Sequence, residues 1–371
     1  MDNHTFNASV AKTLTPLKSL SDAHLAELLS HCAPEFIFKG TKIFERGAKD
    51  LQHVFLLHGE VDLEDEGGEH QTLSGQTCLH ALSPHQPRHE SARAISDCSI
   101  VRIDSKILEN LLTWSQIADY LLLDISHQRD LDEDVQWMMT VLRSNLFFKV
   151  PPTNVQKIFS HLTPKVVSSG DVILRQGEIG DGCYFIKEGS ALVSQSPDGV
   201  KKPEVIATIS EGRCFGEDAL LNETVRNATV TMSENGVLMC LRKSDFIELL
   251  KEPLVETCER QQLESADEPF VYIDVRTEDE YSHGHLDSAV NIPLNLLRLK
   301  IRLLDTQQAY VLYCDSGRRS RAATWLLSQQ GFNVRALDGG LQGAGKGGVQ
   351  HLYQLCQQDY VLRSGIAVAG Q

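Results

Sequence analysis

The 371-residue sequence contains no uninterrupted apolar run of about eighteen residues, the length that a transmembrane helix needs. Residues 1–14 also lack a basic segment followed by an apolar one, so we expect neither a membrane span nor a secretion signal. The nine cysteines are odd in number and follow no regular spacing, which argues against a disulfide framework. We therefore expect a cytoplasmic protein with no membrane partner.

Basic residues are outnumbered, since 35 Lys and Arg stand against 50 Asp and Glu and the net charge is −15. Nucleic acid attracts basic surfaces, so this balance argues against nucleic acid as a partner. With 42% hydrophobic residues, the chain can bury several cores. We expect multiple domains and assign no metal site.

An internal repeat occupies the first two thirds of the chain. An offset of 130 pairs identical residues, namely Gly170, Gly177, Gly189, Ser160-His161 and Pro164 with Gly40, Gly47, Gly59, Ser30-His31 and Pro34. Alternating apolar residues and glycine turns in 171–193, followed by a hairpin turn at Pro197-Asp198-Gly199, predict short antiparallel strands of a β-barrel or jelly roll. Further along, the offset becomes 138, so the second copy has eight extra residues there.

The segment FGEDALLNETVRNATV, residues 215–230, has the residue types that a cyclic phosphodiester needs. Gly216 can adopt the positive φ that lets backbone amides approach a phosphate, and a helical turn after it would aim N–H groups at the same anion. Arg226 offers a charged fork for the phosphate oxygens. Glu217 has the wrong sign for phosphate and suits a ribose hydroxyl. The alternative is a surface helix with a solvated arginine.

These Gly-Glu, Ala-Leu, Arg and Ala-Thr-Val positions resemble the phosphate-binding cassette of the cyclic nucleotide-binding domain of cAMP- and cGMP-dependent kinases and the catabolite activator protein. The resemblance implies cAMP or cGMP as a regulatory ligand, with no covalent or metal cofactor. It places the nucleotide against Phe215, Gly216, Glu217, Asp218, Ala219, Leu220, Arg226, Asn227 and Ala228. In the family, Ala after the arginine favours cAMP and Thr or Ser favours cGMP. Asn227 fits neither rule.

The first copy departs from this cassette where the ligand would bind. Thr77, Cys78 and Leu79 stand in place of Phe215, Gly216 and Glu217, and Glu90 lies two residues from Arg88. Without the glycine turn and the ribose acceptor, we expect this copy to bind nucleotide weakly or not at all. We interpret it as a structural or dimerising copy, although Arg88 keeps a binding role open.

Two helices are expected beside the second barrel. Ser244 is expected to cap a helix over SDFIELLKEPLVETCERQQL, which in the family moves over the bound base; packing on its own barrel is the alternative. Residues 124–142 are expected to form an acidic linker helix between the repeats. Its apolar residues could form a dimer seam, which leaves a homodimer open, but packing on the adjacent barrel is favoured. No helix-turn-helix follows, unlike in the catabolite activator type.

From residue 269 the pattern becomes βαβ. PFVYIDVR and AYVLYC are β-branched runs typical of buried parallel strands, and the second ends at Cys314. A short glycine-containing loop then opens the helix SRAATWLLSQQGF. A cysteine at this position lies at the anion-binding crevice of an α/β sheet, and the loop amides with Arg319 are expected to lower its pKa. The alternative is a buried, inert thiol.

The motifs IDVR, GHLDSAVNIP, CDSGRRS and LDGG, together with Glu280, resemble a single rhodanese domain over roughly residues 265–342. The resemblance implies a sulfurtransferase in which Cys314 carries sulfur as a persulfide, from a small anionic donor to a thiol or cyanide-like acceptor. Arg319 would help to bind the donor, and the loop amides would cradle the sulfur at Asp315, Ser316, Gly317, Arg318 and Ser320. Asp274 and Arg276 would brace the loop.

The loop length bears on the chemistry. Related phosphatases and arsenate reductases use a loop one residue longer, whereas here four residues separate Cys314 from Arg319, which favours sulfur.

The predicted fold is therefore multidomain, α+β and α/β, with two jelly-roll cyclic nucleotide-binding barrels and flanking helices before a rhodanese-like α/β domain with a parallel sheet. The predicted boundaries are an extension at 1–15, a degenerate binding domain with linker helix at 16–140, an intact binding domain at 141–257, a rhodanese domain at 258–345 and a tail at 346–371. Two functions remain: a sulfurtransferase regulated by cyclic nucleotide, and a non-catalytic sensor that uses the rhodanese domain for docking or redox signalling.

Overall fold

The computed structural model describes residues 6–128, 137–138, 141, 151, 154–196, 203–251, 253–264, 269–342, 355–363 and 365–370. The chain forms two compact units, one of Met1–Tyr120 with Val255–Gln371 and the other of Leu121–Leu254. The hairpin turn expected at 197–199 and most of the expected linker helix after residue 128 lie outside the described residues.

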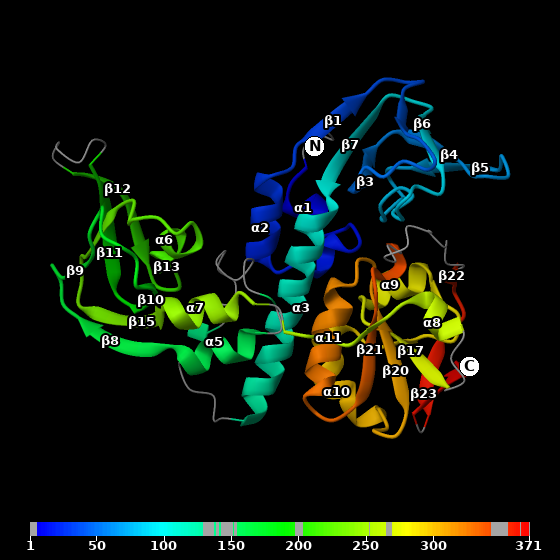
Figure 1. The fold of residues 1–371 in the computed structure, drawn as a ribbon. Helices are drawn as coiled ribbons and strands as arrows, with labels where there is room; N and C mark the ends of the chain where they lie inside the picture. The colour runs from blue at the N-terminus through cyan, green and yellow to red at the C-terminus, as the bar shows by residue number, and fades with distance from the viewer. Residues whose placement is uncertain are drawn as a thin grey trace. The chain divides into compact units, whose positions relative to one another are not determined.

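The first repeat contains two antiparallel sheets with helices before and after them (Figure 1, blue to cyan). Its helical segments are α1 (Ala8–Ala11), η1 (Leu17–Ser19), α2 (Asp22–Ser30) and α3 (Ser105–Gln128). Its strands are β1 (Pro34–Ile37), β2 (Lys42–Phe44), β3 (Gln52–His58), β4 (Glu60–Glu64), β5 (His70–Ser74), β6 (Ser91–Ala94) and β7 (Cys98–Asp104). The strand orders are β1-β7-β3 and β2-β6-β4-β5, and the inward residues, such as Val61 and Leu63 of β4, form one core.

The second repeat has the same arrangement (Figure 1, green). Its strands are β8 (Thr163–Val167), β9 (Val172–Leu174), β10 (Gly182–Glu188), β11 (Ser190–Gln195), β12 (Glu204–Ser210), β13 (Cys214–Phe215), β14 (Thr229–Met232) and β15 (Gly236–Arg242). Its helices are α5 (Val155–His161), α6 (Glu217–Leu221) and α7 (Lys243–Leu249). The orders are β13-β10-β15-β8 and β12-β11-β14-β9. In the described part of the first repeat, β13 and α6 have no counterpart.

The paired glycines explain why the sequence repeat yields a structural repeat. The φ angles are +85° and +92° at Gly40 and Gly170, and +91° at both Gly59 and Gly189. Only glycine adopts such angles without strain, so each pair fixes the same turn in both copies. The expected pair of barrels is confirmed by the two matching sets of antiparallel sheets.

The single long helix expected from Ser244 onward is wrong. The helix α7 ends at Leu249, and Pro253 follows shortly after; its missing N–H and the restricted residue before it disfavour a continuing helix. The N-cap is Arg242, with no side-chain cap, and the Ser244 hydroxyl instead donates to Asp245. Leu254, expected on the apolar side, is fully exposed.

The C-terminal part is built on a five-stranded parallel sheet of order β16-β21-β20-β17-β19, which confirms the expected α/β fold (Figure 1, yellow to red). The strands are β16 (Thr257–Cys258), β17 (Phe270–Asp274), β19 (Val290–Asn291), β20 (Ala309–Tyr313) and β21 (Asn333–Leu337). Two antiparallel pairs join β18 (His285–Leu286) with β22 (Leu355–Cys356), and β23 (Tyr360–Arg363) with β24 (Ile366–Ala369).

Short helices connect these strands, and α11 packs against β20 and β21. The helical segments are α8 (Arg260–Glu264), α9 (Glu278–His283), η4 (Leu294–Leu296), α10 (Leu297–Lys300), η5 (Ile301–Leu303), α11 (Arg318–Ser328) and η6 (Gly340–Gln342). The parallel register places the carboxyl ends of β17 and β20 side by side, since Asp274 is opposite Tyr313. The two motifs IDVR and CDSGRRS therefore meet at one edge of the sheet.

Candidate functional site

The expected nucleotide cassette of the second repeat is assembled around Arg226. Gly216 has a φ of +89° and directly precedes α6. The Arg226 side chain is buried, and its guanidinium donates to the carbonyl oxygens of Gly216 and Gly182 and to the Asp181 carboxylate at 3.2 Å. Because the Asp181 side chain is 84% exposed, water weakens this ion pair.

The other expected contact residues differ in their exposure to solvent. Phe215, Ala219, Leu220 and Ala228 are buried, Glu217 is partly exposed, and Asp218 and Asn227 face solvent. A glycine at position 180 leaves room beside the arginine, because a Cβ there would lie 3.2 Å from both the Ala219 Cβ and the Arg226 Cζ.

The first repeat fills the same position with an acid. At the offset of 130, Asp50 corresponds to Gly180, and its carboxylate accepts from Arg88 Nη2 at 2.9 Å and from Gln86 at 3.0 Å. Burial alone would raise the pKa of Asp50, but hydrogen bonding and the charge of Arg88 outweigh it and lower that pKa. Arg88 also donates to the carbonyl oxygens of Leu82 and Ser83. Its charge is thus neutralised within the protein.

The cysteine loop, residues 314–320, follows β20 and includes the first three residues of α11. Gly317 has a φ of +86° and directly precedes α11. Cys314 is fully buried, with its Sγ 3.8 Å from the Ser320 hydroxyl, which in turn donates to the Gly317 carbonyl oxygen. Arg318 is partly exposed.

The last glycine of the LDGG motif and the two residues after it contact the backbone of this loop. The amides of Leu341 and Gln342 donate to the carbonyl oxygens of Cys314 and Asp315 at 2.9 and 2.8 Å. A Cβ on Gly340 would lie 2.1 Å from the Cys314 carbonyl oxygen, so only glycine fits there. The motif therefore sets the conformation of the cysteine loop.

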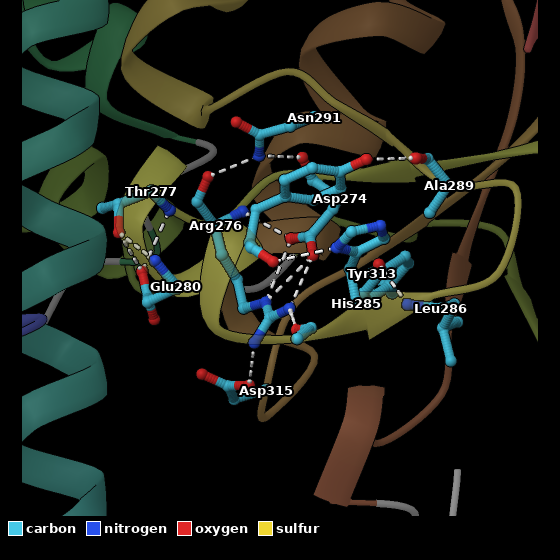
Figure 2. Close-up of polar contacts among 12 residues, drawn as sticks. Asp274, Arg276, Thr277, Glu280, His285, Leu286, Ala289, Asn291, Tyr313 and Asp315 are labelled. Carbon is cyan, nitrogen blue, oxygen red and sulfur yellow. Dashed lines mark hydrogen bonds and ion pairs between the residues drawn. The ribbon is translucent and has the colours of Figure 1, made fainter. Parts of the chain in front are cut away.

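Arg276 joins the end of β17 to the cysteine loop. Its guanidinium lies against both Asp274, at 2.7 Å, and Asp315, at 3.1 Å, as Figure 2 shows. It also donates to the Gly284 carbonyl oxygen, which ties the loop to the GHLDSAVNIP motif. These contacts fix the loop without leaving the guanidinium of Arg276 free for a ligand.

Arg319 is completely buried and pairs mainly with Glu280. Its Nη1 and Nη2 each lie 2.8 Å from a Glu280 oxygen, and Nη2 lies 3.4 Å from Asp315. Glu280 is held by the Thr277 amide and hydroxyl in the capping box that begins α9 (Figure 2). Burial works to raise the pKa of Glu280, but the charge and hydrogen bonds of Arg319 lower it strongly.

The pKa of the Cys314 thiol differs from the sequence expectation. Burial raises it above the ordinary value, and the nearby Glu109 carboxylate adds to the rise. Arg319 acts in the expected direction but does not outweigh burial, because its charge is shared among carboxylates. The thiol is therefore largely protonated at neutral pH in this conformation.

Glu109 of α3 was not expected at this site. Its Oε1 lies 3.2 Å from Arg319 Nη2, and its Oε2 accepts from the Ser316 hydroxyl at 2.9 Å. Within the same unit, Lys18 pairs with Asp279 and the His80 ring stacks on that of His283 at 4.0 Å. The first repeat thus contacts the cysteine loop directly. An acid within the apolar run ILENLLTW was the available signal.

A cavity of about 60 Å³ lies between the first repeat and the cysteine loop. Arg276 and Asp315 line this cavity together with four histidines, His53, His80, His85 and His283. Burial lowers the pKa of all four, that of His85 to about 4. They are therefore neutral at physiological pH.

The described residues contain neither a candidate membrane span nor a candidate metal site. Among them, no helix is both long and apolar enough to cross a bilayer. Within the same residues, no three His, Cys, Asp or Glu side chains gather in a way that could hold a metal ion.

Family comparisons match both regions. The family model described as the cyclic nucleotide-binding domain matches residues 164–252, and that described as the rhodanese-like domain matches residues 259–345. The chain contains a cyclic nucleotide-binding domain and a rhodanese-like domain. The family match to the cyclic nucleotide-binding domain covers the second repeat, and the structure adds the paired sheets of the first.

Curated relatives cover about 60% of this chain and less than two thirds of their own length. The cAMP-dependent protein kinase regulatory subunit of Schizosaccharomyces pombe is 40% identical over 246 residues, covering 63% of this chain and 57% of that protein. Human cGMP-dependent protein kinase 2 is 30% identical over 228 residues, covering 60% of this chain but only 27% of the kinase. A solved structure of the regulatory domain of Toxoplasma gondii PKA with cAMP is 19% identical, covering 67% of this chain and 94% of that one, with a TM-score of 0.25.

Proposed function

We propose that the protein is a sulfurtransferase that carries sulfane sulfur on Cys314 and is regulated by cAMP or cGMP bound in the second repeat. The observation that carries the proposal is the cysteine loop, in which Cys314 follows a buried strand, Gly317 has a positive φ, and Gly340 with the two residues after it fixes the loop backbone. This loop belongs to a region that matches the rhodanese-like family.

The proposed reaction has two steps. The Cys314 thiolate attacks the outer sulfur of thiosulfate, the S–S bond of the donor breaks, and sulfite leaves with the bonding electron pair, giving a Cys314 persulfide anion. A nucleophilic acceptor such as cyanide then attacks the terminal sulfur, forming thiocyanate and regenerating the thiolate. Ser320 and the loop amides stabilise the anionic sulfur in both forms.

The surrounding residues support this chemistry by position. Arg276 braces Asp315 against Asp274, and Glu280 orients Arg319 beneath the loop. Since the pKa of Cys314 is raised by burial, opening of the loop to water favours the thiolate. Access to Cys314 is therefore the natural step to regulate.

The regulatory part of the proposal rests on Arg226 and α3. Arg226 is held toward Gly216 by carbonyl oxygens, and among the described residues its ion-pair partner is the exposed Asp181 carboxylate, so its charge would be available to a cyclic phosphate. The helix α3 carries Glu109 beside the cysteine loop and continues into the second unit, since the boundary between units follows Tyr120. Coupling through such a helix requires that nucleotide binds two conformations with different affinities.

A second candidate function is a non-catalytic nucleotide sensor whose rhodanese domain docks a partner or responds to redox state. The observation in its favour is that Cys314 is 0% exposed and that Glu109 lies against its loop. In that case the cysteine loop serves the contact with the first repeat rather than a substrate.

The proposal is tested by measuring the thiosulfate:cyanide sulfurtransferase activity of the full chain, with and without saturating cAMP or cGMP. The Cys314→Ser variant, measured under the same conditions, is the control. The proposal predicts a rate that depends on Cys314 and changes with one nucleotide. Nucleotide binding by Cys314→Ser without any rate from the wild type would instead favour the sensor.

A further inference from the structure

The charges buried around the cysteine loop are unequal in number. Two guanidinium groups, Arg276 and Arg319, face four carboxylates in the ion pairs among the described residues, namely Asp274, Glu280, Asp315 and Glu109. Three of these acids belong to the rhodanese-like region and its loop. The fourth, Glu109, comes from α3 of the first repeat.

Glu109 is held at the loop by the groups that would receive an anion. Its two oxygens contact the Ser316 hydroxyl at 2.9 Å and Arg319 Nη2 at 3.2 Å, and its side chain is only 4% exposed. A hydroxyl and a guanidinium converging on a carboxylate are the contacts that sulfate-like anions form in proteins. The Glu109 carboxylate therefore occupies an anion position of the loop.

Glu109 is not needed to neutralise Arg319. Glu280 already binds that guanidinium through two contacts of 2.8 Å, and one carboxylate balances one guanidinium. A second carboxylate adds negative charge beside Cys314. In a buried site, such a like charge repels an incoming anion, and a dianion more than a monoanion.

We propose that Glu109 is a specificity-determining residue that disfavours dianionic sulfur donors, such as thiosulfate, relative to monoanionic ones, such as an organic thiosulfonate. This inference rests on the proposed sulfurtransferase function. A thiosulfonate transfers its outer sulfur to the Cys314 thiolate and leaves as a sulfinate, which takes the electrons of the broken S–S bond. Charge is conserved, because one thiolate and one monoanion give one persulfide anion and one sulfinate.

The kinetic test compares the wild type with Glu109→Gln, which keeps the shape and removes the charge. We expect the KM for thiosulfate to fall on the order of tenfold, because a like charge is removed from a buried site, with kcat within about twofold. The KM for methanethiosulfonate should fall by clearly less. Glu66→Gln, which removes an exposed acid of the same repeat, should change neither value.

A binding test separates this inference from the proposed function. Titration calorimetry of thiosulfate into the full-length Cys314→Ser protein and into the Cys314→Ser, Glu109→Gln double variant needs no turnover. Tighter binding by the double variant supports the role of Glu109 even where no persulfide forms, in which case the sulfurtransferase proposal alone is lost. Glu109→Ala is a second variant should Glu109→Gln not fold, since it removes the charge without placing an amide beside Asp315.

The inference is overturned when Glu109→Gln leaves thiosulfate binding and KM unchanged. It is also overturned when both donors gain equally, since that result indicates wider access to Cys314 rather than a change in charge selectivity.

Discussion

Glu109 and Arg319 are 210 residues apart in the chain, yet their side chains pair at 3.2 Å with both buried. This contact makes the first repeat part of the surroundings of Cys314. The first repeat resembles a nucleotide-binding domain, but its Arg88 is neutralised by Asp50. The repeat instead contributes the Glu109 carboxylate to the cysteine loop.

The two corresponding arginines should behave differently on truncation. Arg226→Ala should reduce affinity for cAMP and cGMP by about a hundredfold or more, because a desolvated charged partner of the phosphate is lost. Arg88→Ala should leave nucleotide affinity unchanged but destabilise the fold by about 3 kcal/mol, because it leaves Asp50 without its partner. Calorimetric titration and urea unfolding measure the two effects. Equal loss of nucleotide affinity in both variants would contradict this assignment.

Gly340→Ala should disturb the cysteine loop. The added Cβ would lie 2.1 Å from the Cys314 carbonyl oxygen, so the loop backbone must move and persulfide formation should fall by at least about tenfold. Gly331→Ala is the matched control, because its φ is +83° but no atom lies within 4 Å of the added Cβ. It should cost about 1 kcal/mol of stability from backbone strain alone, with activity retained. Similar activity in the two variants would argue against loop positioning by LDGG.

The effect of Glu109 on thiosulfate should depend on pH. Burial raises the pKa of Glu109, the charges of Asp315 and Glu280 add to the rise, and Arg319 and Ser316 oppose it. As pH falls through this raised pKa, Glu109 takes up a proton and loses its charge. The ratio of KM between wild type and Glu109→Gln should therefore approach one as the pH falls and Glu109 becomes neutral in the wild type. A ratio independent of pH would count against the charge effect.

Stability should fall in acid because of the histidine cavity. Burial lowers the pKa of His85 from 6.5 to about 4; His89, Arg276 and His283 act in the same direction and Asp315 opposes them. The unfolded chain therefore binds a proton that the folded protein does not, and the free energy of unfolding decreases as pH falls from 6.5 toward about 4. Scanning calorimetry of His85→Gln should show a weaker decrease over this range. His31→Gln, at an exposed position, should retain the wild-type dependence.

The repeat and the cysteine loop could be predicted because their signals are local. Paired glycines with positive φ, such as Gly59 and Gly189, mark the same turns in both copies, and a buried strand followed by CDSGRRS specifies the strand, loop and helix. The length of α7 could not be predicted from apolar periodicity, because that periodicity continues past Pro253 whereas the helix ends at Leu249.

Contacts between distant segments could not be predicted in the same way. Periodicity indicates that Glu109 lies in an apolar helix but not which loop it faces, and that contact is what decides its role. The raised pKa of Cys314 depends on burial by the whole fold, which no local motif encodes. The sequence repeat shows that Asp50 corresponds to Gly180. It does not show that Asp50 forms an ion pair with Arg88, which only the structure reveals.

The most direct test of the central claim is intact and peptide mass spectrometry of the full chain after incubation with thiosulfate, followed by cyanide. We predict the addition of one sulfur atom at Cys314, which cyanide removes as thiocyanate, and no addition in Cys314→Ser. Absence of a Cys314 persulfide with thiosulfate and methanethiosulfonate alike, in both wild type and Glu109→Gln, would contradict the sulfurtransferase account.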